Sequence, residues 1–123
     1  MYYLTVKRSF AAAHRIVGYE GACSRYHGHN FSVEVEVEGK DLNELGMVMD
    51  FKELKELVDG VISGLDHQDL NRFPPFRGRN PTSESLAKYI YDKLKPLIEP
   101  PLSLSSVTVW ETAGYRVTYR ESR

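Results

Sequence analysis

The clearest pattern in the sequence is a strict alternation of apolar and polar residues over positions 31–38. Every second position is apolar and the positions between carry serine or glutamate: Phe31, Val33, Val35 and Val37 against Ser32, Glu34, Glu36 and Glu38. A period of two predicts a half-buried strand, which we expect to cover residues 27–38. Residues 2–14 predict a second strand, whose apolar positions include Leu4, Val6 and Phe10. Residues 15–26, with two glycines, predict a loop between them.

Two segments show helical periodicity instead. Asp50 stands three residues before Glu53 in a capping-box pattern, and a helical stripe follows with Gly64 as its expected stop. That stripe is Leu54, Leu57, Val58, Val61, Ile62 and Leu65. The second helix is expected to begin after Thr82 as N-cap, with Glu84 in its first turn. Pro100 and Pro101 close it, and the proline-containing residues 65–81 between the helices predict a loop.

The sequence ends with two more expected strands, Ser105 to Thr112 and Tyr115 to Arg120, joined by a hairpin-like turn. The predicted order is therefore ββααββ, an α+β fold with two helices on one face of a four-stranded antiparallel sheet. The other face would carry the strand glutamates opposite Lys7, Arg116 and Arg120. Either this face is solvated or it lines an oligomer. The two open sheet edges favour edge-to-edge association of subunits.

Composition narrows the class of protein. With 123 residues, 41% hydrophobic and 27% charged, residues 1–123 predict a single soluble globular domain. The formal net charge is −1 without a basic block, so we expect no nucleic-acid or membrane partner. A single cysteine cannot form an internal disulfide, and the sequence shows neither the apolar run of a signal peptide nor that of a membrane helix. We therefore expect a cytoplasmic protein.

Candidate chemistry is concentrated around residues 14–29. His27 and His29 stand two apart, so on a strand they point to the same face. His14 ends the preceding predicted strand, and all three histidines fall on the apolar parity of their strands. Three imidazoles with an open fourth position form the usual catalytic zinc shell. The alternative is that His14 is an ordinary core histidine and the other two form a surface pair.

The only cysteine, Cys23, lies four residues before His27. It could be a small buried hydrophobe. It could be a fourth metal ligand, which would close the site and make it structural. It could also be a base or nucleophile beside the metal, because nearby positive charge lowers the pKa of a thiol. The second and third possibilities imply opposite functions.

Two further features carry ionisable groups. Asp66 and His67 lie in the loop after the first helix, where they form either a catalytic dyad or a turn-capping aspartate beside an exposed histidine. Glu111 continues the apolar parity of Val107 and Val109, so its carboxylate is expected to need a partner. That partner is either an arginine or a ligand with two parallel N–H donors, such as a guanine-like or pterin ring.

Taken together, these segments resemble the 6-pyruvoyl-tetrahydropterin synthase / 6-carboxy-5,6,7,8-tetrahydropterin synthase family. The matching segments are Phe10 to His14, Cys23 to His29, Gly46 to Phe51, Leu65 to His67 with Leu70-Asn71, Asn80 to Glu84, and Trp110 to Thr112. They follow one another along nearly the whole chain. The short spacing from Cys23 to His27 is more similar to the 6-carboxy branch, and the presence of a cysteine argues against a branch that carries glutamate in its place.

The resemblance implies the tunnelling fold (T-fold), in which ββααββ subunits join into a trimeric barrel and two trimers stack into a hexamer. It implies that His14, His27 and His29 bind Zn²⁺ and that Cys23 is the proton-abstracting thiolate. Asp66 and His67 would form a relay that reaches the site from a neighbouring subunit. Glu111 would anchor the pterin, with Thr82 and Glu84 near the ring.

The implied activity is zinc-dependent conversion of 7,8-dihydroneopterin triphosphate to 6-carboxy-5,6,7,8-tetrahydropterin, acetaldehyde and triphosphate, in queuosine or other 7-deazapurine biosynthesis. The first alternative is a 6-pyruvoyl-tetrahydropterin synthase, which eliminates triphosphate from the same substrate. The second is a non-catalytic zinc- or pterin-binding protein. Arg15, Arg25, Arg77 and Arg79 are candidates to bind the triphosphate by loop position alone.

Overall fold

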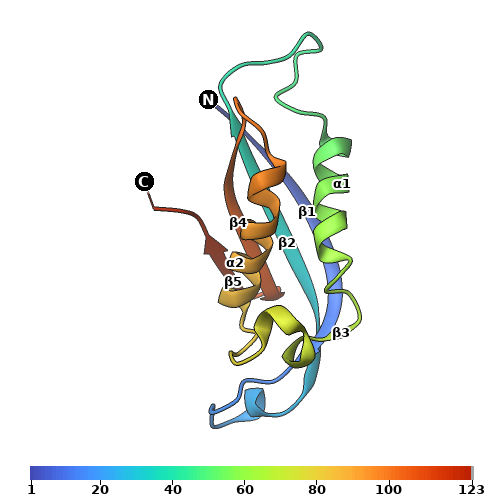
Figure 1. The fold of residues 1–123 in the computed structure, drawn as a ribbon, viewed down its shortest axis with the longest axis vertical. Coiled ribbons are helices and arrows are strands. Elements are labelled where there is room, and N and C mark those ends of the chain that lie inside the picture. Colours follow the sequence, from blue (N-terminus) through green and yellow to red (C-terminus); the bar gives the residue numbers. More distant parts are fainter. Residues whose placement is uncertain (123) are drawn as a thin grey trace.

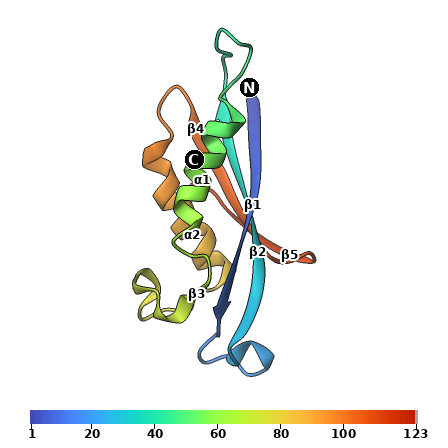
Figure 2. The same ribbon diagram turned by 90° about the vertical axis from the view of Figure 1, so that its right-hand side faces the viewer.

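The computed structural model describes residues 1–122, which form a mixed five-stranded sheet with two α-helices packed on one face (Figures 1 and 2). The spatial order of the strands is β3-β1-β2-β4-β5. The strands are β1 (Tyr2–His14), β2 (His27–Gly39), β3 (Gln68–Asp69), β4 (Ser103–Thr112) and β5 (Tyr115–Tyr119), and the helices are α1 (Phe51–Ile62) and α2 (Ser83–Leu94). Short 3₁₀ turns cover Ala22–Ser24, Leu70–Arg72, Pro74–Phe76 and Lys95–Leu97. The expected α+β T-fold subunit is confirmed.

The long pair β1 and β2 is the frame of the sheet. These strands run antiparallel in unbroken register from Tyr2 opposite Gly39 to His14 opposite His27. The alternation of apolar residues in β2 places Phe31, Val33, Val35 and Val37 at 0% exposure under the helices. Because the register is unbroken, the parity predicted from sequence holds to the last residue of β1.

Both helices begin where the sequence predicts. The Asp50 carboxylate accepts the backbone N–H of Lys52 at 2.9 Å, and the Thr82 hydroxyl accepts that of Ser85 at 3.1 Å. These bonds satisfy N–H groups that the first helical turn leaves open. Helix α1 ends at Ile62, two residues before the expected stop at Gly64.

The predicted sheet of four antiparallel strands is incomplete. Residues 65–81 contain the two-residue strand β3, which pairs parallel to β1 at Ala12 and Ala13. Such a strand is too short to show any periodicity, so the sequence predicts only a loop there. The ends of the last two strands also differ slightly, since β4 begins at Ser103 and β5 ends at Tyr119. No helix among residues 1–122 is long and apolar enough to span a membrane.

The sheet face away from the helices carries the predicted polar residues. Lys7 lies opposite Glu34 in the register, with Nζ 3.9 Å from Oε1, which confirms one of the expected cross-strand charge pairs. Arg116 instead lies over the ring of Trp110, 5.2 Å from its centroid. Toward the other end of the sheet, Glu36 accepts a hydrogen bond from the hydroxyl of Ser105.

Candidate metal centre

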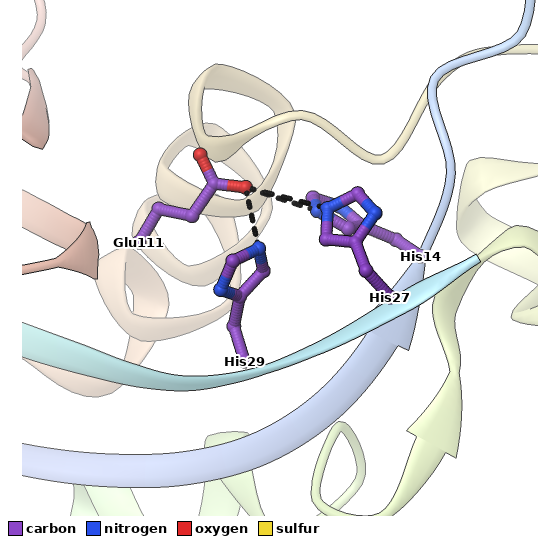
Figure 3. Close-up of side chains that lie close together, drawn as sticks. All are labelled: His14, His27, His29 and Glu111. Carbon is purple, nitrogen blue, oxygen red and sulfur yellow. Dashed lines mark hydrogen bonds and ion pairs between the residues drawn. The ribbon is translucent and has the colours of Figure 1, made fainter. Parts of the chain in front are cut away.

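Three histidines converge at the end of the sheet where β1 finishes and β2 begins (Figure 3). His14 and His27 are direct partners in the register, and His29 lies opposite Ala12. All three side chains therefore project from the same sheet face, with ring centroids 4.6 Å apart for His14 and His27 and 4.7 Å apart for His27 and His29. The predicted convergence of the imidazoles is what the structure shows.

Backbone carbonyls determine which ring nitrogens of two histidines carry the proton. His14 Nδ1 lies 2.7 Å from the carbonyl oxygen of Pro81, and His27 Nδ1 lies 2.7 Å from that of Arg25. A carbonyl oxygen only accepts, so each Nδ1 is the N–H donor. In the neutral ring each Nε2 then keeps its lone pair, and both face the interior of the cluster. This arrangement orients histidines for metal binding.

Glu111 supplies a fourth donor atom to the cluster. Its Oε1 lies 3.1 Å from Nε2 of His14, 3.2 Å from Nε2 of His29 and 3.9 Å from Nε2 of His27 (Figure 3). The four ligand atoms all lie within 4.8 Å of one another. The carboxylate oxygen and the Nε2 atom of neutral His14 are both acceptors, so their close approach is stabilised by a shared proton or by a cation. Three imidazoles and one carboxylate are a donor set that Zn²⁺ accepts.

The position of Glu111 on its strand allows this approach. On β4 it lies at every second position after Val107 and Val109, which point toward the core. It has no partner residue on β5, because the pairing of the two strands shifts between Trp110 and Thr112. Its partners are histidines and not the arginine considered from sequence. The sequence predicted an arginine or a ligand as its partner and not the histidines, because nothing in the pattern shows that the strand of Glu111 ends beside His14.

Burial and neighbouring charges both act on the imidazole of His29. The side chain of His14 is 2% exposed and that of His29 is 23% exposed. Burial lowers the pKa of His29 below its ordinary value, and the neighbouring His27 and His14 lower it further, although Glu111 acts to raise it. The neutral imidazole is favoured, and this is the form that binds a metal.

An aromatic layer lies beneath the imidazoles. The ring of Phe31 meets those of His14 and His29 edge-on, with centroid separations of 5.5 Å and 5.6 Å. On its other side Phe31 stacks on Phe10 at 5.2 Å, and both phenylalanines belong to the buried core. The apolar core therefore holds two of the histidine rings in position from below.

Cys23 lies near the cluster in sequence but does not join it. It is exposed, in the 3₁₀ turn Ala22–Ser24, and its sulfur is not among the clustered ligand atoms of residues 1–122. The exposure contradicts the buried-hydrophobe alternative, and the geometry offers no support for a closed Cys/His₃ site. The backbone holds the turn in place, because Ile16 donates its N–H to the carbonyl of Cys23 at 2.7 Å.

Asp66 and His67 form the expected pair, but at the edge of the sheet. The Asp66 carboxylate lies 3.1 Å from His67 Nδ1 and also accepts the N–H of Ala11 at 2.9 Å. The side chain of His67 is 82% exposed, and its backbone has a φ of 58°. Among residues 1–122, none of the hydrogen bonds or ion pairs joins this pair to the histidine cluster. The Ala11 N–H is the main reason why the pKa of Asp66 is lowered.

The two predicted residues at the start of α2 lie differently. Thr82 follows Pro81, whose carbonyl binds His14, but its hydroxyl is occupied by capping the helix. Glu84 is exposed and lines a separate hollow with Lys88 and Tyr119. The structure thus brings together His14, His27, His29 and Glu111, places Thr82 next to them in sequence, and leaves Glu84 outside.

Two asparagines have a positioning role that the sequence analysis did not assign. The Asn71 amide accepts the N–H of Arg15 at 2.8 Å and donates to its carbonyl at 3.0 Å. The Asn80 amide makes the same pair of bonds with Val17, at 2.8 and 3.0 Å. Each amide thus pairs with the backbone N–H and carbonyl of one residue after β1, in the way that a residue of a neighbouring strand would. The only signal in the sequence is their presence in two of the segments quoted above.

The fold and the site define an α+β protein with a cluster of four donor atoms, able to hold a metal ion, on the helix-covered face of the sheet. Comparison with known proteins gives the family. Residues 3–122 match the family described as 6-pyruvoyl tetrahydropterin synthase, and the chain belongs to that family.

Individual relatives carry several names. The chain is 39% identical over 105 residues to dihydroneopterin monophosphate aldolase of Pyrococcus furiosus, covering 85% of each chain. It is 40% identical over 120 residues to 6-carboxy-5,6,7,8-tetrahydropterin synthase of Synechocystis, covering 94% of this chain and 90% of that one. The solved structure of 6-pyruvoyl tetrahydropterin synthase from Caenorhabditis elegans superposes with a TM-score of 0.82 at 32% identity, covering 99% of this chain and 98% of that one.

Proposed function

We propose that this chain is a zinc-dependent 6-carboxy-5,6,7,8-tetrahydropterin synthase, which converts 7,8-dihydroneopterin triphosphate and water to 6-carboxytetrahydropterin, acetaldehyde and triphosphate. The observation that carries the proposal is the convergence of three histidine Nε2 atoms and one Glu111 oxygen within 4.8 Å. The similarity to the Synechocystis enzyme, over 94% of this chain, supports the choice of reaction. The proposed setting is the cytoplasm, in queuosine or 7-deazapurine biosynthesis.

His14, His27 and His29 are the proposed zinc ligands. When bound, Zn²⁺ supplies Lewis acidity, which makes C–H and O–H bonds next to a coordinated oxygen easier to ionise. The chain contributes the orientation of the ligands, through the carbonyls of Pro81 and Arg25 and the Phe31 ring. These contacts come from the chain itself and restrain the rings of the proposed ligands.

Cys23 is proposed to remove a carbon-bound proton from the substrate. Its exposure leaves the thiol accessible, and its absence from the group of clustered ligand atoms leaves it free to act as a base. His67, held by the Asp66 carboxylate, is proposed to transfer the oxygen-bound proton. Cleavage of the carbon–carbon bond would then follow as a retro-aldol-like step.

We further propose that His67 acts in the site of a neighbouring subunit. The side chain is 82% exposed beside β1, and no hydrogen bond or ion pair among the described residues joins it to its own cluster. In the described part of the chain, the outer edge of β1 before Ala11 and that of β5 have no strand partner. Joining such edges would form the trimeric barrel, and two barrels would form the hexamer, with the sheet face that carries Lys7 and Glu34 as lining.

For the substrate ring, Glu111 is the proposed anchor. Its Oε1 is within the histidine cluster, and the carboxylate has a second oxygen for the paired N–H groups of a pterin. Thr82 is proposed to lie near the ring because it follows Pro81, which contacts His14. Glu84 stays a prediction from the resemblance, since it faces a different hollow.

A second candidate function is favoured by the similarity to the Pyrococcus enzyme. An aldolase acting on dihydroneopterin monophosphate would break a carbon–carbon bond of the same side chain, with the same need for proton transfer. Cleavage between the first two side-chain carbons would leave the phosphate on the small aldehyde. The two reactions therefore differ in a product that can be measured.

The decisive experiment is product analysis with the zinc-loaded protein. Dihydroneopterin triphosphate should give acetaldehyde and 6-carboxytetrahydropterin in equal amounts. A pyruvoyl product without acetaldehyde would show instead the 6-pyruvoyl synthase reaction. A phosphorylated aldehyde, formed from the monophosphate and not from the triphosphate, would identify the aldolase.

A further inference from the structure

A second hollow lies beside the metal centre, next to two of its ligands. Arg15, which follows His14, and Tyr26, which precedes His27, both line it. The remaining lining residues come from the chain after β1 and from the loop before α2: Val17, Asn71, Phe76, Gly78, Arg79 and Asn80. Consecutive Cα atoms are about 3.8 Å apart, so this hollow and the histidine cluster share their supporting backbone.

The two arginines of the hollow have no acidic partner. Among residues 1–122, no ion pair joins a carboxylate to Arg15 or Arg79. The Nε atom of Arg15 is buried without a hydrogen-bond partner, and its guanidinium lies 5.9 Å from the centroid of Tyr26. An uncompensated cation with a buried, unused donor costs free energy unless something binds it.

The two asparagine amides in the hollow are already occupied. The amides of Asn71 and Asn80 are bound to the backbone of Arg15 and Val17. Arg79 donates from Nε and Nη2 to the carbonyl of Pro75, at 3.2 and 2.8 Å, which leaves Nη1 without a bond of this kind. The charged groups that remain for a ligand are thus the guanidiniums of Arg15 and Arg79, beside the hydroxyl of Tyr26.

We infer that Arg15 and Arg79 form a binding site for a phosphate-type dianion. Resting on the proposed function, the group bound there is the phosphate tail of the pterin substrate. Guanidinium groups bind phosphate oxygens through paired N–H donors and stay charged at any physiological pH. Two guanidiniums match the double charge of a terminal phosphate. The substrate's reacting carbons would lie at the histidines while its phosphate reached this adjoining hollow.

The structure also distinguishes Arg15 and Arg79 from the other two arginines considered as triphosphate ligands. Arg25 and Arg77 were suggested by the same loop positions, but neither lines the hollow. Arg77 is exposed and lies two residues before Arg79 in the same loop. It therefore offers a matched control, because its replacement removes the same charge from the same loop without removing a donor from the hollow.

The first measurement is the affinity of the zinc-loaded protein for inorganic phosphate, determined from the broadening of the phosphate ³¹P NMR line. Arg15→Gln and Arg79→Gln should each weaken binding about tenfold or more, the loss expected for one charged hydrogen-bond donor, and Arg77→Gln should not. Wild-type-like binding by both Gln variants, or an equal loss in Arg77→Gln, would overturn the site. Arg79 is exposed, so its variant keeps the test independent of any folding defect in Arg15→Gln.

The second measurement assigns the phosphate to the substrate. With a phosphorylated dihydroneopterin, both Gln variants should raise KM about tenfold or more with a smaller change in kcat, while affinity for unphosphorylated dihydroneopterin stays at the wild-type level. Unchanged KM alongside weakened phosphate binding would overturn the assignment to the substrate tail. The protein could also bind phosphate, lose that binding in the Arg15 and Arg79 variants but not in Arg77→Gln, and yet turn over no pterin. That result would refute the proposed function and support the anion site.

Discussion

Glu111 Oε1 lies 3.1 Å from Nε2 of His14, although their strands, β4 and β1, are separated in the sheet by β2. The contact crosses over the strand that carries the other two histidines, so the four donor atoms are held by three strands together. A site built this way depends on the relative positions of all three strands. It also gives Glu111 two possible functions, metal binding and substrate binding, which a single variant can separate.

Glu111→Gln should keep zinc and lose substrate affinity. Three histidines suffice for a stable zinc site, whereas an amide in place of the carboxylate loses the charge-assisted pair of bonds to a pterin. We expect metal content equal to wild type by atomic absorption and a pterin affinity about tenfold lower or worse. Zinc loss on this substitution would make Glu111 a metal ligand, and unchanged pterin affinity would remove it as the anchor.

Cys23→Ala should abolish turnover without removing the metal. A positioned base contributes about 10²–10⁴-fold to a proton transfer, and the thiol lies outside the clustered donor atoms. The measurements are steady-state kcat and zinc content on the same preparation. The structural-zinc alternative makes the opposite forecast, namely that the variant loses zinc and folded protein together.

Asn71→Ala should destabilise the protein by about 1–3 kcal/mol, because it leaves the backbone N–H and carbonyl of Arg15 without their partners. Urea unfolding of the zinc-loaded protein would measure the change. A change below about 0.5 kcal/mol, the usual range for surface substitutions, would contradict this role of the Asn71 amide.

Asp66 should stabilise the fold more at neutral pH than in acid. The N–H of Ala11, and to a lesser degree His67, lower the pKa of this carboxyl below its ordinary value of 3.8. A folded pKa below the unfolded one means that the stabilisation is complete above the unfolded pKa and is lost as pH falls through the folded pKa. Comparing wild type with Asp66→Asn, the difference in unfolding midpoint should shrink below about pH 4. A difference independent of pH between 7 and 3 would contradict the interpretation.

The histidine cluster could be predicted because it follows from local periodicity. Once residues 2–14 and 27–38 are strands, His14, His27 and His29 must share a face, and a regular antiparallel register brings them together. The same reasoning gave the helix caps at Asp50 and Thr82, which depend on neighbours in the chain.

Features that depend on distant parts of the chain could not be predicted. Glu111 reaches the histidines only because β4 lies beside β2, which no local pattern specifies. Strand β3 has two residues and leaves no periodic trace. The bonds of Asn71 to Arg15 join residues 56 positions apart and use a side chain as if it were backbone. Asparagine in a loop is so common that its residue type alone does not indicate such a role.

The ring of Phe31, packed between Phe10 and the imidazoles of His14 and His29, makes the candidate metal centre continuous with the hydrophobic core. Free energy gained by ion binding and free energy gained by core packing are therefore thermodynamically linked, since each restrains the same rings. A substitution in this part of the core would lower the affinity for metal, and bound metal would raise the free energy of unfolding.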